Sequence, residues 1–373
     1  MQWIDNVTDL SGKRVLLRAD YNAPVVDGQV VDAFRVTVLL PTLLFLRDAG
    51  AKVIILSHFG RDALSIEPIY RELRKHVPIS FVEDIVGDVA RSAVERLEDG
   101  EILLLENVRR DPREVDNNDD FARELASLAD VYVNDAFAAS HREHASIIGV
   151  PRYLPHYGGL RLREEIEALT HSLQPEDASI FILGGIKFET KFPLIEKFSR
   201  IYDEVFVCGA LANNFFRAQG FEIGDSLISG ADVDMSGLGS LPNVSLPIDV
   251  VVSDSGKNQI RRLDEIEKGE RILDAGPATA ELLRDKIAQA RFVLWNGPLG
   301  EYEHGFTEGT DALTHAIVES DARCVIGGGD TVAAVSQLGL RDKFSFVSTG
   351  GGAMLEFLLH GTLPGIEALE DGH

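Results

Sequence analysis

Short apolar segments rich in β-branched residues alternate with longer amphipathic segments along the whole chain. Apolar runs of this length, bounded by Gly, Asn and Asp, predict β-strands. In the first half of the chain they lie at residues 14–18, 52–57, 79–83, 101–107 and 130–135. In the second half they lie at residues 179–185, 204–209, 247–252, 271–276, 291–297, 323–329 and 344–352.

The segments between these strands have the period of amphipathic helices, as in residues 116–129 and 276–290. The first of the two begins with Asp and Asn residues that suit a helix N-cap. Strands alternating with helices predict parallel sheets that carry helices on both faces. Because the strands outnumber the roughly eight of a closed α/β barrel, we expect an α/β protein with two doubly wound, Rossmann-like domains.

The length of 373 residues also suits two domains of roughly 150 residues each. The best boundary is the segment 155–177, in which Gly158 and Gly159 precede a charged helical stretch that ends before Pro175. We therefore expect a first domain over residues 1–157, a connecting helix and hinge over 158–175, and a second domain over 176–356. The tail 357–373 is expected to pack back onto the first domain.

The composition narrows the possible partners. The net charge is −24, which disfavours nucleic acid, because a phosphate backbone needs a basic face. The two cysteines, Cys208 and Cys324, form no C-x-x-C motif and are expected to be reduced and buried. The most apolar stretch, residues 36–46, is shorter than the roughly 18 residues of a membrane span. With no signal peptide in the sequence, we expect a cytoplasmic protein with no membrane partner.

Charged side chains follow most of the predicted strands in the first half. Ligands of parallel sheets bind beyond the carboxyl ends of the strands, which meet at one edge. The residues at these ends are Asp20, Asn22, His58, Arg61, Asn107, Arg109, Arg110, His141, Arg142 and His144, with Arg35 after the first loop. Each of these residues alone is better explained as a solvated loop residue. Together, in a chain this acidic, the arginines and histidines predict a pocket for a ligand with several anionic groups.

Glycines follow the predicted strands of the second half. They are Gly184–Gly185, Gly209, Gly276, Gly297, Gly300, Gly327–Gly329 and Gly350–Gly352. Glycine lets a backbone approach a ligand closely and leaves N–H groups at the next helix start for a phosphate. Lys187 and Lys191 lie four residues apart after the first glycine pair, so a helix would place both on one face. Asp330 is placed to reach a Mg²⁺ ion carried by phosphates.

One domain thus offers fixed cations, and the other offers glycine backbone and two lysines. This combination favours phosphoryl transfer, in which positioning and charge neutralisation provide most of the catalysis. The motifs of other classes are absent from the sequence: it has no G-x-G-x-x-G with a downstream acid, no G-x-x-x-x-G-K-[ST] loop, no G-x-S-x-G and no H-E-x-x-H.

The chain resembles the phosphoglycerate kinases over essentially its full length. The segments that carry the resemblance occur in the order of the family: LLRADYNAPVVDG, SHFGR, LLLENVR, VNDAFAASHREHAS, LGGIKFETK, IGDSL, WNGPLGEYE, GGGDT and STGGGAMLEFL. The resemblance implies reversible transfer of a phosphoryl group between 1,3-bisphosphoglycerate and MgADP, giving 3-phosphoglycerate and MgATP. It also implies a monomer in glycolysis or gluconeogenesis that closes about a hinge, so that transfer is direct.

The resemblance further implies a role for particular residues. The glycerate-binding pattern falls on Asp20, Tyr21, Asn22, Arg35, His58, Phe59, Gly60, Arg61, Arg109 and Arg142. The nucleotide-binding pattern falls on Lys191, Asn296, Pro298, Glu303, Gly328, Gly329, Asp330 and Thr331, with Asp330 meeting Mg²⁺ through the nucleotide phosphates. Arg35, Lys187 and Gly351 match the residues that assist the transferring group.

Several segments depart from the family pattern. Arg61 runs directly into DALSIEP instead of a Pro-Lys-Gly loop, and the segment after IGDSL is short. Cys208 and Ala210 replace glycines, and Glu301 stands where the family usually has an apolar residue. These changes concern the shape and base preference of the nucleotide pocket. A kinase for another acyl phosphate and a non-catalytic binding protein are the alternatives, which a substrate panel and a turnover assay would distinguish.

Overall fold

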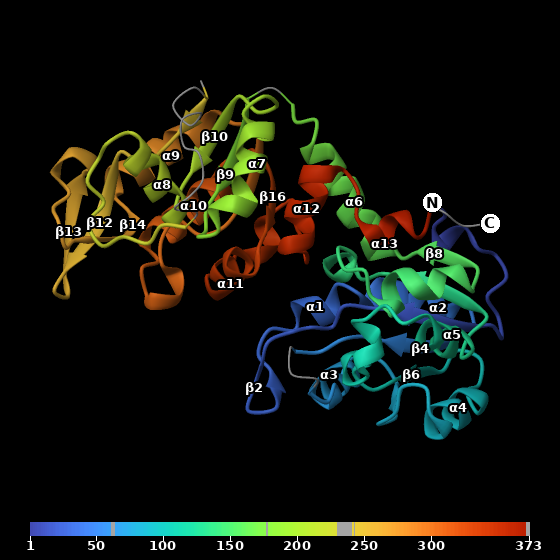
Figure 1. Cartoon of the computed structure of the whole chain (residues 1–373). Helices are drawn as coiled ribbons and strands as arrows, with labels where there is room; N and C mark the ends of the chain where they lie inside the picture. Colours follow the sequence, from blue (N-terminus) through green and yellow to red (C-terminus); the bar gives the residue numbers. More distant parts are fainter. Residues whose placement is uncertain (61–63, 177, 230–240, 242, 371–373) are drawn as a thin grey trace. The chain divides into compact units, whose positions relative to one another are not determined.

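The structure is a computed structural model that describes the chain except for residues 61–63, 177, 230–240, 242 and 371–373. The chain forms two compact units (Figure 1). Unit 1 comprises Met1–Glu167 with His360–His373, and unit 2 comprises Ala168–Leu359. The division falls within helix α6 (Leu160–Ser172) and near the end of α12 (Gly352–His360).

Unit 1 is built on a parallel sheet with the strand order β5-β6-β4-β1-β7-β8. Its strands are β1 (Arg14–Arg18), β4 (Lys52–Leu56), β5 (Ser80–Phe81), β6 (Ile102–Leu104), β7 (Val131–Asn134) and β8 (His156–Gly158). A hairpin of β2 (Val25–Val26) and β3 (Gln29–Val30) follows β1. The central strands β1 and β4 are buried from their second residue onward, which is why they read as continuous apolar runs.

The connections of unit 1 are mostly helical. The α-helices are α1 (Phe34–Thr37), α2 (Leu40–Asp48), α3 (Glu67–Leu73), α4 (Asp88–Glu95), α5 (Asp119–Ala126) and α13 (Pro364–Glu367). Helix α5 shows why they form: the Asn118 side chain accepts a hydrogen bond from the backbone N–H of Phe121, and Phe121 and Leu125 are buried. In α13, the backbone N–H of Gly365 donates to the carbonyl of Ser140 at 2.8 Å.

Unit 2 contains a second parallel sheet with the order β11-β10-β9-β15-β16-β17. Its strands are β9 (Ser179–Leu183), β10 (Glu204–Val207), β11 (Val244–Ser245), β15 (Phe292–Asn296), β16 (Arg323–Gly327) and β17 (Phe346–Val347). Its helices are α7 (Phe188–Phe198), α8 (Ala210–Ala218), α9 (Pro277–Gln289), α10 (Glu308–Glu319), α11 (Gly329–Gln337) and α12. The predicted pair of α/β domains with parallel sheets is therefore confirmed.

Two strands of the second half differ from the expectation. Residues 247–252 and 271–276 contribute to a separate antiparallel sheet, β13-β12-β14, instead of the parallel one. Its strands are β12 (Asp249–Asp254), β13 (Lys257–Arg262) and β14 (Arg271–Ala275). The physical reason is a two-residue turn, Ser255–Gly256, in which both residues have positive φ (50° and 83°). Such a turn pairs the flanking strands as an antiparallel hairpin.

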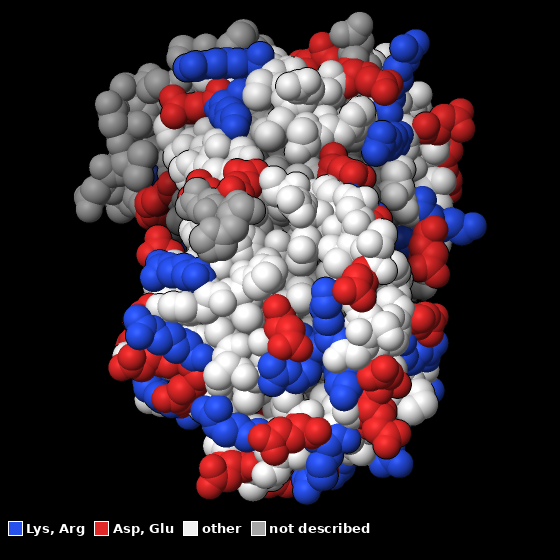
Figure 2. Space-filling view, turned by 90° about the vertical axis from the view of Figure 1, so that its right-hand side faces the viewer, with Lys and Arg blue, Asp and Glu red and all other residues white. Residues whose placement is uncertain are grey.

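Charges of both signs are mixed on the surface. Figure 2 shows acidic and basic side chains interspersed on the face that it presents. Anion-binding sites are therefore expected in local clusters of cations and not in the charge of the whole surface. In the part of the chain that the structure describes, no helix combines the length and apolarity that crossing a membrane requires.

Candidate functional site

The strand ends of unit 1 bring an acid, an arginine and a histidine together. Asp20 follows β1, Arg35 lies in α1, and His58 follows β4. An Nη1 atom of Arg35 lies 3.4 Å from Oδ2 of Asp20, and Nδ1 of His58 lies 3.8 Å from Oδ1 of the same carboxylate. Asp20 is thus the ionic partner of Arg35 and lies beside the imidazole of His58.

Burial and charge set the protonation states of this group. Burial alone would raise the pKa of Asp20, but the neighbouring charges of His58, Arg35 and Arg18 lower it to about 2. Burial lowers the pKa of His58 to about 3, and Arg18, Arg109 and Arg142 contribute to the lowering against the effect of Asp20. At neutral pH the aspartate is ionised and the imidazole is neutral.

The loop after β4 is fixed to two other strand ends. The backbone N–H of Gly60 donates to Oδ1 of Asn22 at 3.0 Å, and Nη1 of Arg109 donates to the carbonyl of Gly60 at 3.1 Å. The other terminal nitrogen of Arg109, Nη2, is buried without a hydrogen-bond partner among the described residues. Burial and the charges of Arg142 and Arg18 lower the pKa of Arg109 to about 10. A guanidinium held among other cations in this way is suited to receive an anion.

Arg142 completes the basic cluster, by which we mean Arg35, His58, Arg109 and Arg142. Its Nε lies 3.3 Å from Nε2 of His141. Its charge lowers the pKa of Arg109, of His58 and of His144, which places it near all three. The structure therefore brings these four predicted residues to one edge of the sheet of unit 1.

Three other predicted glycerate-binding residues do not contribute a described side chain to the basic cluster. The side chains of Tyr21 and Phe59 belong to the hydrophobic core of unit 1, so only their backbones border the strand ends. Their backbone N–H groups donate to Ser57 and Asn107 respectively. Arg61 lies outside the described residues.

A buried group behind the basic cluster was not predicted. Arg18, the last residue of β1, is fully buried; its Nε donates to Oγ of Ser146 at 2.8 Å, and its Nη2 lies 3.4 Å from Nδ1 of His58. Ser146 in turn donates to Glu114 at 2.6 Å. Because a guanidinium only donates, Nδ1 of His58 accepts and its ring hydrogen lies on Nε2. The clue in the sequence was a charged residue that ends an otherwise apolar strand.

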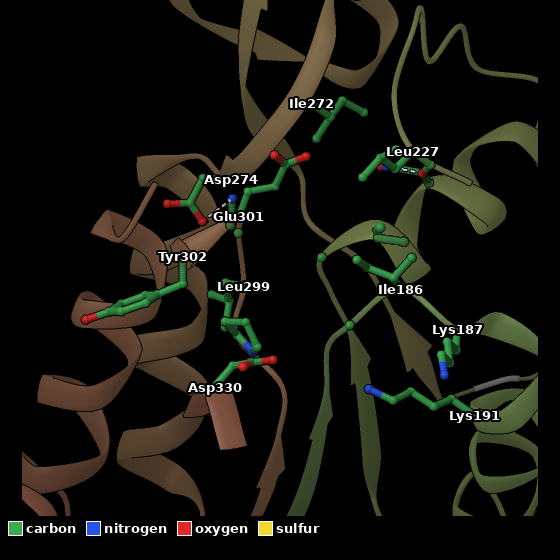
Figure 3. A pocket seen from close by; sticks show the side chains of 18 of the residues that line it. Ile186, Lys187, Lys191, Leu227, Ile272, Asp274, Leu299, Glu301, Tyr302 and Asp330 are labelled. Carbon is green, nitrogen blue, oxygen red and sulfur yellow. Dashed lines mark hydrogen bonds between the residues drawn. The ribbon is translucent and has the colours of Figure 1, made fainter. Parts of the chain in front are cut away.

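Unit 2 contains a cavity of about 570 Å³ at the ends of its strands. That volume lies within the range of small-molecule sites. Figure 3 shows Lys187, Lys191 and Asp330 at one end and Leu227 and Ile272 at the other. The predicted residues that line it are Lys187, Lys191, Pro298, Glu303 and Asp330. The cavity therefore has a charged end and an apolar end.

Lys191 is the best-defined cation of this cavity. It lies in the first turn of α7, and its ammonium group donates to the carbonyl of Gly184. Burial lowers the pKa of Lys191 to about 8, although Cys208 and Asp330 act in the opposite direction. Gly185, with φ of 120°, leaves the space that the amine occupies, since a Cβ there would collide with Nζ. Lys187 is exposed and is the N-cap residue of α7.

The loops after β9 and β15 approach each other closely. A Cβ on Gly184 would collide with the carbonyl of Pro298, and one on Gly297 would collide with Gly184. Thr331 joins the loop after β15 to α11, because its Oγ1 accepts a hydrogen bond from the backbone N–H of Gly297 at 2.7 Å. Glycine at these strand ends is thus required by backbone packing as well as by any ligand.

The glycine-rich turn before α11 presents Asp330 to the cavity. Gly328 has φ of 99° and is the N-cap residue, and Asp330 lies in the first turn. The carboxylate of Asp330 at the charged end suits a Mg²⁺ ion that arrives with phosphates, since Mg²⁺ keeps few protein ligands. The predicted residues that do not line the cavity are Asn296, Gly328, Gly329, Thr331 and Gly351.

Acidic residues border the apolar half of the cavity. Glu301 accepts a hydrogen bond from Nη2 of Arg271 at 2.5 Å and lies 3.0 Å from Nδ1 of His304. Asp274 accepts from the backbone N–H groups of Ala275 and Gly309, and burial raises its pKa to about 6. Asp274 was not among the predicted site residues; the available indication was a carboxylate inside the otherwise apolar strand β14.

A family model and individual relatives all match this chain to the phosphoglycerate kinases. The family model described as phosphoglycerate kinase matches residues 4–361. Phosphoglycerate kinase from Roseiflexus sp. (strain RS-1) is 40% identical over 97% of this chain and 98% of its own. Phosphoglycerate kinase from Moorella thermoacetica is 41% identical over 97% of this chain and 98% of its own.

Solved structures agree with the sequence comparisons. Phosphoglycerate kinase from Coxiella burnetii has a TM-score of 0.83 at 35% identity and covers 98% of each chain. The enzyme from Pyrococcus horikoshii OT3 has a TM-score of 0.87 at 32% identity, covering 99% of this chain and 98% of its own. The match extends over both units and includes the segments that hold the basic cluster and the cavity. The chain therefore belongs to the phosphoglycerate kinase family.

Proposed function

We propose that this chain catalyses the reversible transfer of a phosphoryl group between 1,3-bisphosphoglycerate and MgADP, giving 3-phosphoglycerate and MgATP. The observation that supports this most strongly is that one chain carries both the basic cluster and a cavity with a Lys191–Asp330 end. The two anionic groups of 3-phosphoglycerate, its phosphate and its carboxylate, suit the basic cluster. A nucleotide, with its phosphates and its largely apolar base, suits the cavity. Membership of the phosphoglycerate kinase family supports this choice of substrates.

In unit 1, the basic cluster would bind the glycerate through its phosphate and carboxylate groups. Arg109 supports this role because Nη1 is held by Gly60 while Nη2 is buried without a partner among the described residues. An anion at this position would satisfy that donor and would relieve the repulsion between Arg109 and Arg142. His58, with its hydrogen on Nε2, would donate a neutral hydrogen bond. Asn22 and Asp20 would orient the loop and the basic side chains.

In unit 2, the cavity would bind the nucleotide with its phosphates at the charged end. Lys191 would contact them directly, and Asp330 would meet the Mg²⁺ ion that the phosphates carry. Glu303, which lines the same cavity, would bind the ribose hydroxyls. Pro298 and the glycine turns would shape the wall beside the phosphates.

We further propose that the transfer is direct and that Arg35, Lys187 and the backbone of Gly351 assist it. During transfer, negative charge is spread over the oxygens of the moving group, and fixed cations stabilise it. Lys187 is an exposed residue at the start of α7 and Arg35 is held by Asp20, so each unit would contribute one cation. A helix N-terminus such as that of α12, which begins at Gly352, offers backbone N–H groups for the same purpose.

The decisive test is an assay of the purified protein with 3-phosphoglycerate and MgATP, coupled to a second enzyme that consumes the acyl phosphate. Turnover in the range of ordinary kinases, about 1–100 s⁻¹, is expected. Folded protein without turnover would refute the proposal. A panel of other carboxylates is the control, and a clear preference for one of them would assign a different acyl phosphate.

Closure of the two units can be tested separately by small-angle scattering. The family resemblance predicts that the radius of gyration decreases only when both substrates are bound. Glycerate alone and nucleotide alone are the controls. An unchanged radius with both substrates would contradict closure without affecting the assignment of the reaction.

A further inference from the structure

A short turn carries Glu303 at the cavity of unit 2. The turn is the 3₁₀-helix η9 (Tyr302–His304), and its three residues line the cavity together with Glu301. The side chain of Glu303 is exposed and forms no hydrogen bond or ion pair with the residues that the structure describes. A carboxylate without partners binds a ligand precisely only if the turn that carries it is fixed. The question is therefore what fixes this turn.

Glu301 fixes the start of the turn on strand β14. Its backbone N–H donates to the carbonyl of Leu273 at 2.8 Å. Oε1 of its side chain accepts a hydrogen bond from Nη2 of Arg271 at 2.5 Å. Leu273 and Arg271 both belong to β14, so the main chain and the side chain of Glu301 are held by the same strand.

The same side chain also reaches the last residue of the turn. Oε2 of Glu301 lies 3.0 Å from Nδ1 of His304, and the backbone N–H of His304 donates to the carbonyl of Glu301 at 2.9 Å. A carboxylate only accepts, so Nδ1 of His304 carries the hydrogen in this contact. Glu301 therefore contacts the residue on the far side of Glu303, and both of its carboxylate oxygens are engaged.

Tyr302 is held by a different element. Its hydroxyl donates to Oε1 of Gln337, in α11, at 3.0 Å. Figure 3 shows the Tyr302 ring and the Glu301 carboxylate pointing in different directions from adjacent positions. Of the residues from Glu301 to His304, all but Glu303 thus have a side-chain contact among the described residues, and the carboxylate of Glu303 is left for a ligand.

We propose that Glu301 is a positioning residue for the nucleotide, because its contacts with Arg271 and His304 fix the turn that carries Glu303. A turn that is ordered before the nucleotide arrives lowers the cost of ordering it on binding. The proposal rests on the proposed function, in which Glu303 binds the ribose hydroxyls. It adds a residue that acts through Glu303.

The test is calorimetric titration of the whole protein with the Mg²⁺ complexes of ADP and of 2′,3′-dideoxy-ADP, which lacks both ribose hydroxyls. Hydrogen bonds to a charged group are strong, so the unaltered protein should bind ADP roughly tenfold more tightly. In Glu303→Leu this preference should fall to near unity. Equal affinity of the unaltered protein for the two nucleotides would overturn the proposal, because Glu303 would have no ribose contact to position.

Glu301→Leu tests the positioning residue itself. Leucine fills similar space but contacts neither Arg271 nor His304 as an acceptor. The Kd for MgADP should rise several-fold, whereas the Kd for the dideoxy nucleotide should stay the same, since that nucleotide makes no use of Glu303. An unchanged preference for ADP would overturn the proposal. An equal loss of affinity for both nucleotides would also overturn it, because Glu301 would then act on the cavity as a whole.

Glu204→Leu is the matched control. Glu204 forms an ion pair with Lys286 at 2.7 Å, and its side chain is 19% exposed, against 20% for Glu301. It does not line the cavity, so its loss should leave the preference for ADP at roughly tenfold. An equal fall of the preference in Glu204→Leu would overturn the proposal, since the loss of any such ion pair would then be sufficient.

The positioning role and the proposed reaction fail in different ways. If the chain does not catalyse the proposed reaction, 3-phosphoglycerate is not turned over with MgATP. If only the positioning role is wrong, turnover proceeds and Glu301→Leu keeps the preference for ADP. Should Glu301→Leu not fold, Glu301→Gln replaces it: glutamine keeps the length of the side chain but loses the charge that holds Arg271. The preference for ADP should fall in this variant too, and an unchanged preference would overturn the proposal.

Discussion

The two units hold their anion-binding groups in different ways. In unit 1, side chains hold one another: Asp20 pairs with Arg35, and Arg18 contacts both His58 and Ser146, which donates to Glu114. In unit 2, backbone holds the side chains: Lys191 donates to the carbonyl of Gly184, and Thr331 accepts from the N–H of Gly297.

This difference has a physical cause. Paired side chains fix the direction of each donor before a small ligand arrives, which lowers the cost of ordering them. Glycine turns instead let two loops and a lysine approach within van der Waals contact, which shapes a wall for a larger ligand. The basic cluster of unit 1 therefore depends on its side-chain partners, whereas the cavity of unit 2 depends on backbone conformation. Three substitutions and one change of pH test this difference.

The largest effect is expected from Arg35→Ala. If Arg35 stabilises the transferring group, kcat should fall by a factor on the order of 10³, by analogy with arginine fingers, while KM changes little. Steady-state kinetics with both substrates measure this. The control is Arg71→Ala, which removes an exposed helical arginine paired with Glu67. A kcat within a few-fold of the unaltered protein would remove Arg35 from the reaction.

Lys191→Ala tests the cavity of unit 2. Hydrogen bonds to charged groups are typically worth about 1.5–3 kcal/mol, so the Kd for MgADP should rise roughly 10- to 150-fold. Calorimetry measures this, and glycerate binding to unit 1 should stay the same. Unaltered affinity for MgADP would show that Lys191 is held by Gly184 for structural reasons alone.

Ser146→Ala tests the side-chain network of unit 1. It removes the acceptor of Arg18 and a donor to Glu114, both buried, and should destabilise unit 1 by about 1–3 kcal/mol. The two tryptophans, Trp3 in unit 1 and Trp295 in unit 2, allow each unit to be followed by fluorescence in single-tryptophan variants.

Only the unfolding midpoint reported by Trp3 should move. Ser92→Ala, an exposed serine in α4, is the control and should change neither midpoint. If Ser146→Ala leaves the Trp3 midpoint where it was, the network does not stabilise unit 1.

The smallest effect concerns pH. Because burial lowers the pKa of Lys191 to about 8, its amine is charged below that pH and neutral above it. MgADP needs the charged form, so its affinity should be constant below pH 8 and should fall at higher pH by up to about tenfold per unit. Lys191→Arg, which stays charged, should remove this dependence. A flat profile in the unaltered protein would contradict the lowered pKa.

Much of the fold could be predicted because the strands of both parallel sheets are buried apolar runs. The antiparallel sheet was not predicted, because its pairing is set by the turn at Ser255–Gly256 and by packing beyond the local pattern. Likewise, the sequence identified Lys187 and Lys191 together, but only the structure shows that Lys187 stands at the N-cap position of α7 while Lys191 folds back over Gly185. Asp274 was missed because it has no motif; it becomes a lining residue only when segments far apart in the sequence meet.

The sequence by itself determined the alternation of strands and helices, the membership of a family and the kinds of residue at the strand ends. These follow from local periodicity and residue chemistry, which each segment carries with it. Only the tertiary structure decided which polar atoms have hydrogen-bond partners and which, like Nη2 of Arg109, have none among the described residues. The reason is that burial and hydrogen-bond partners come from residues distant in the chain, and it is this burial that lowers the pKa of Lys191.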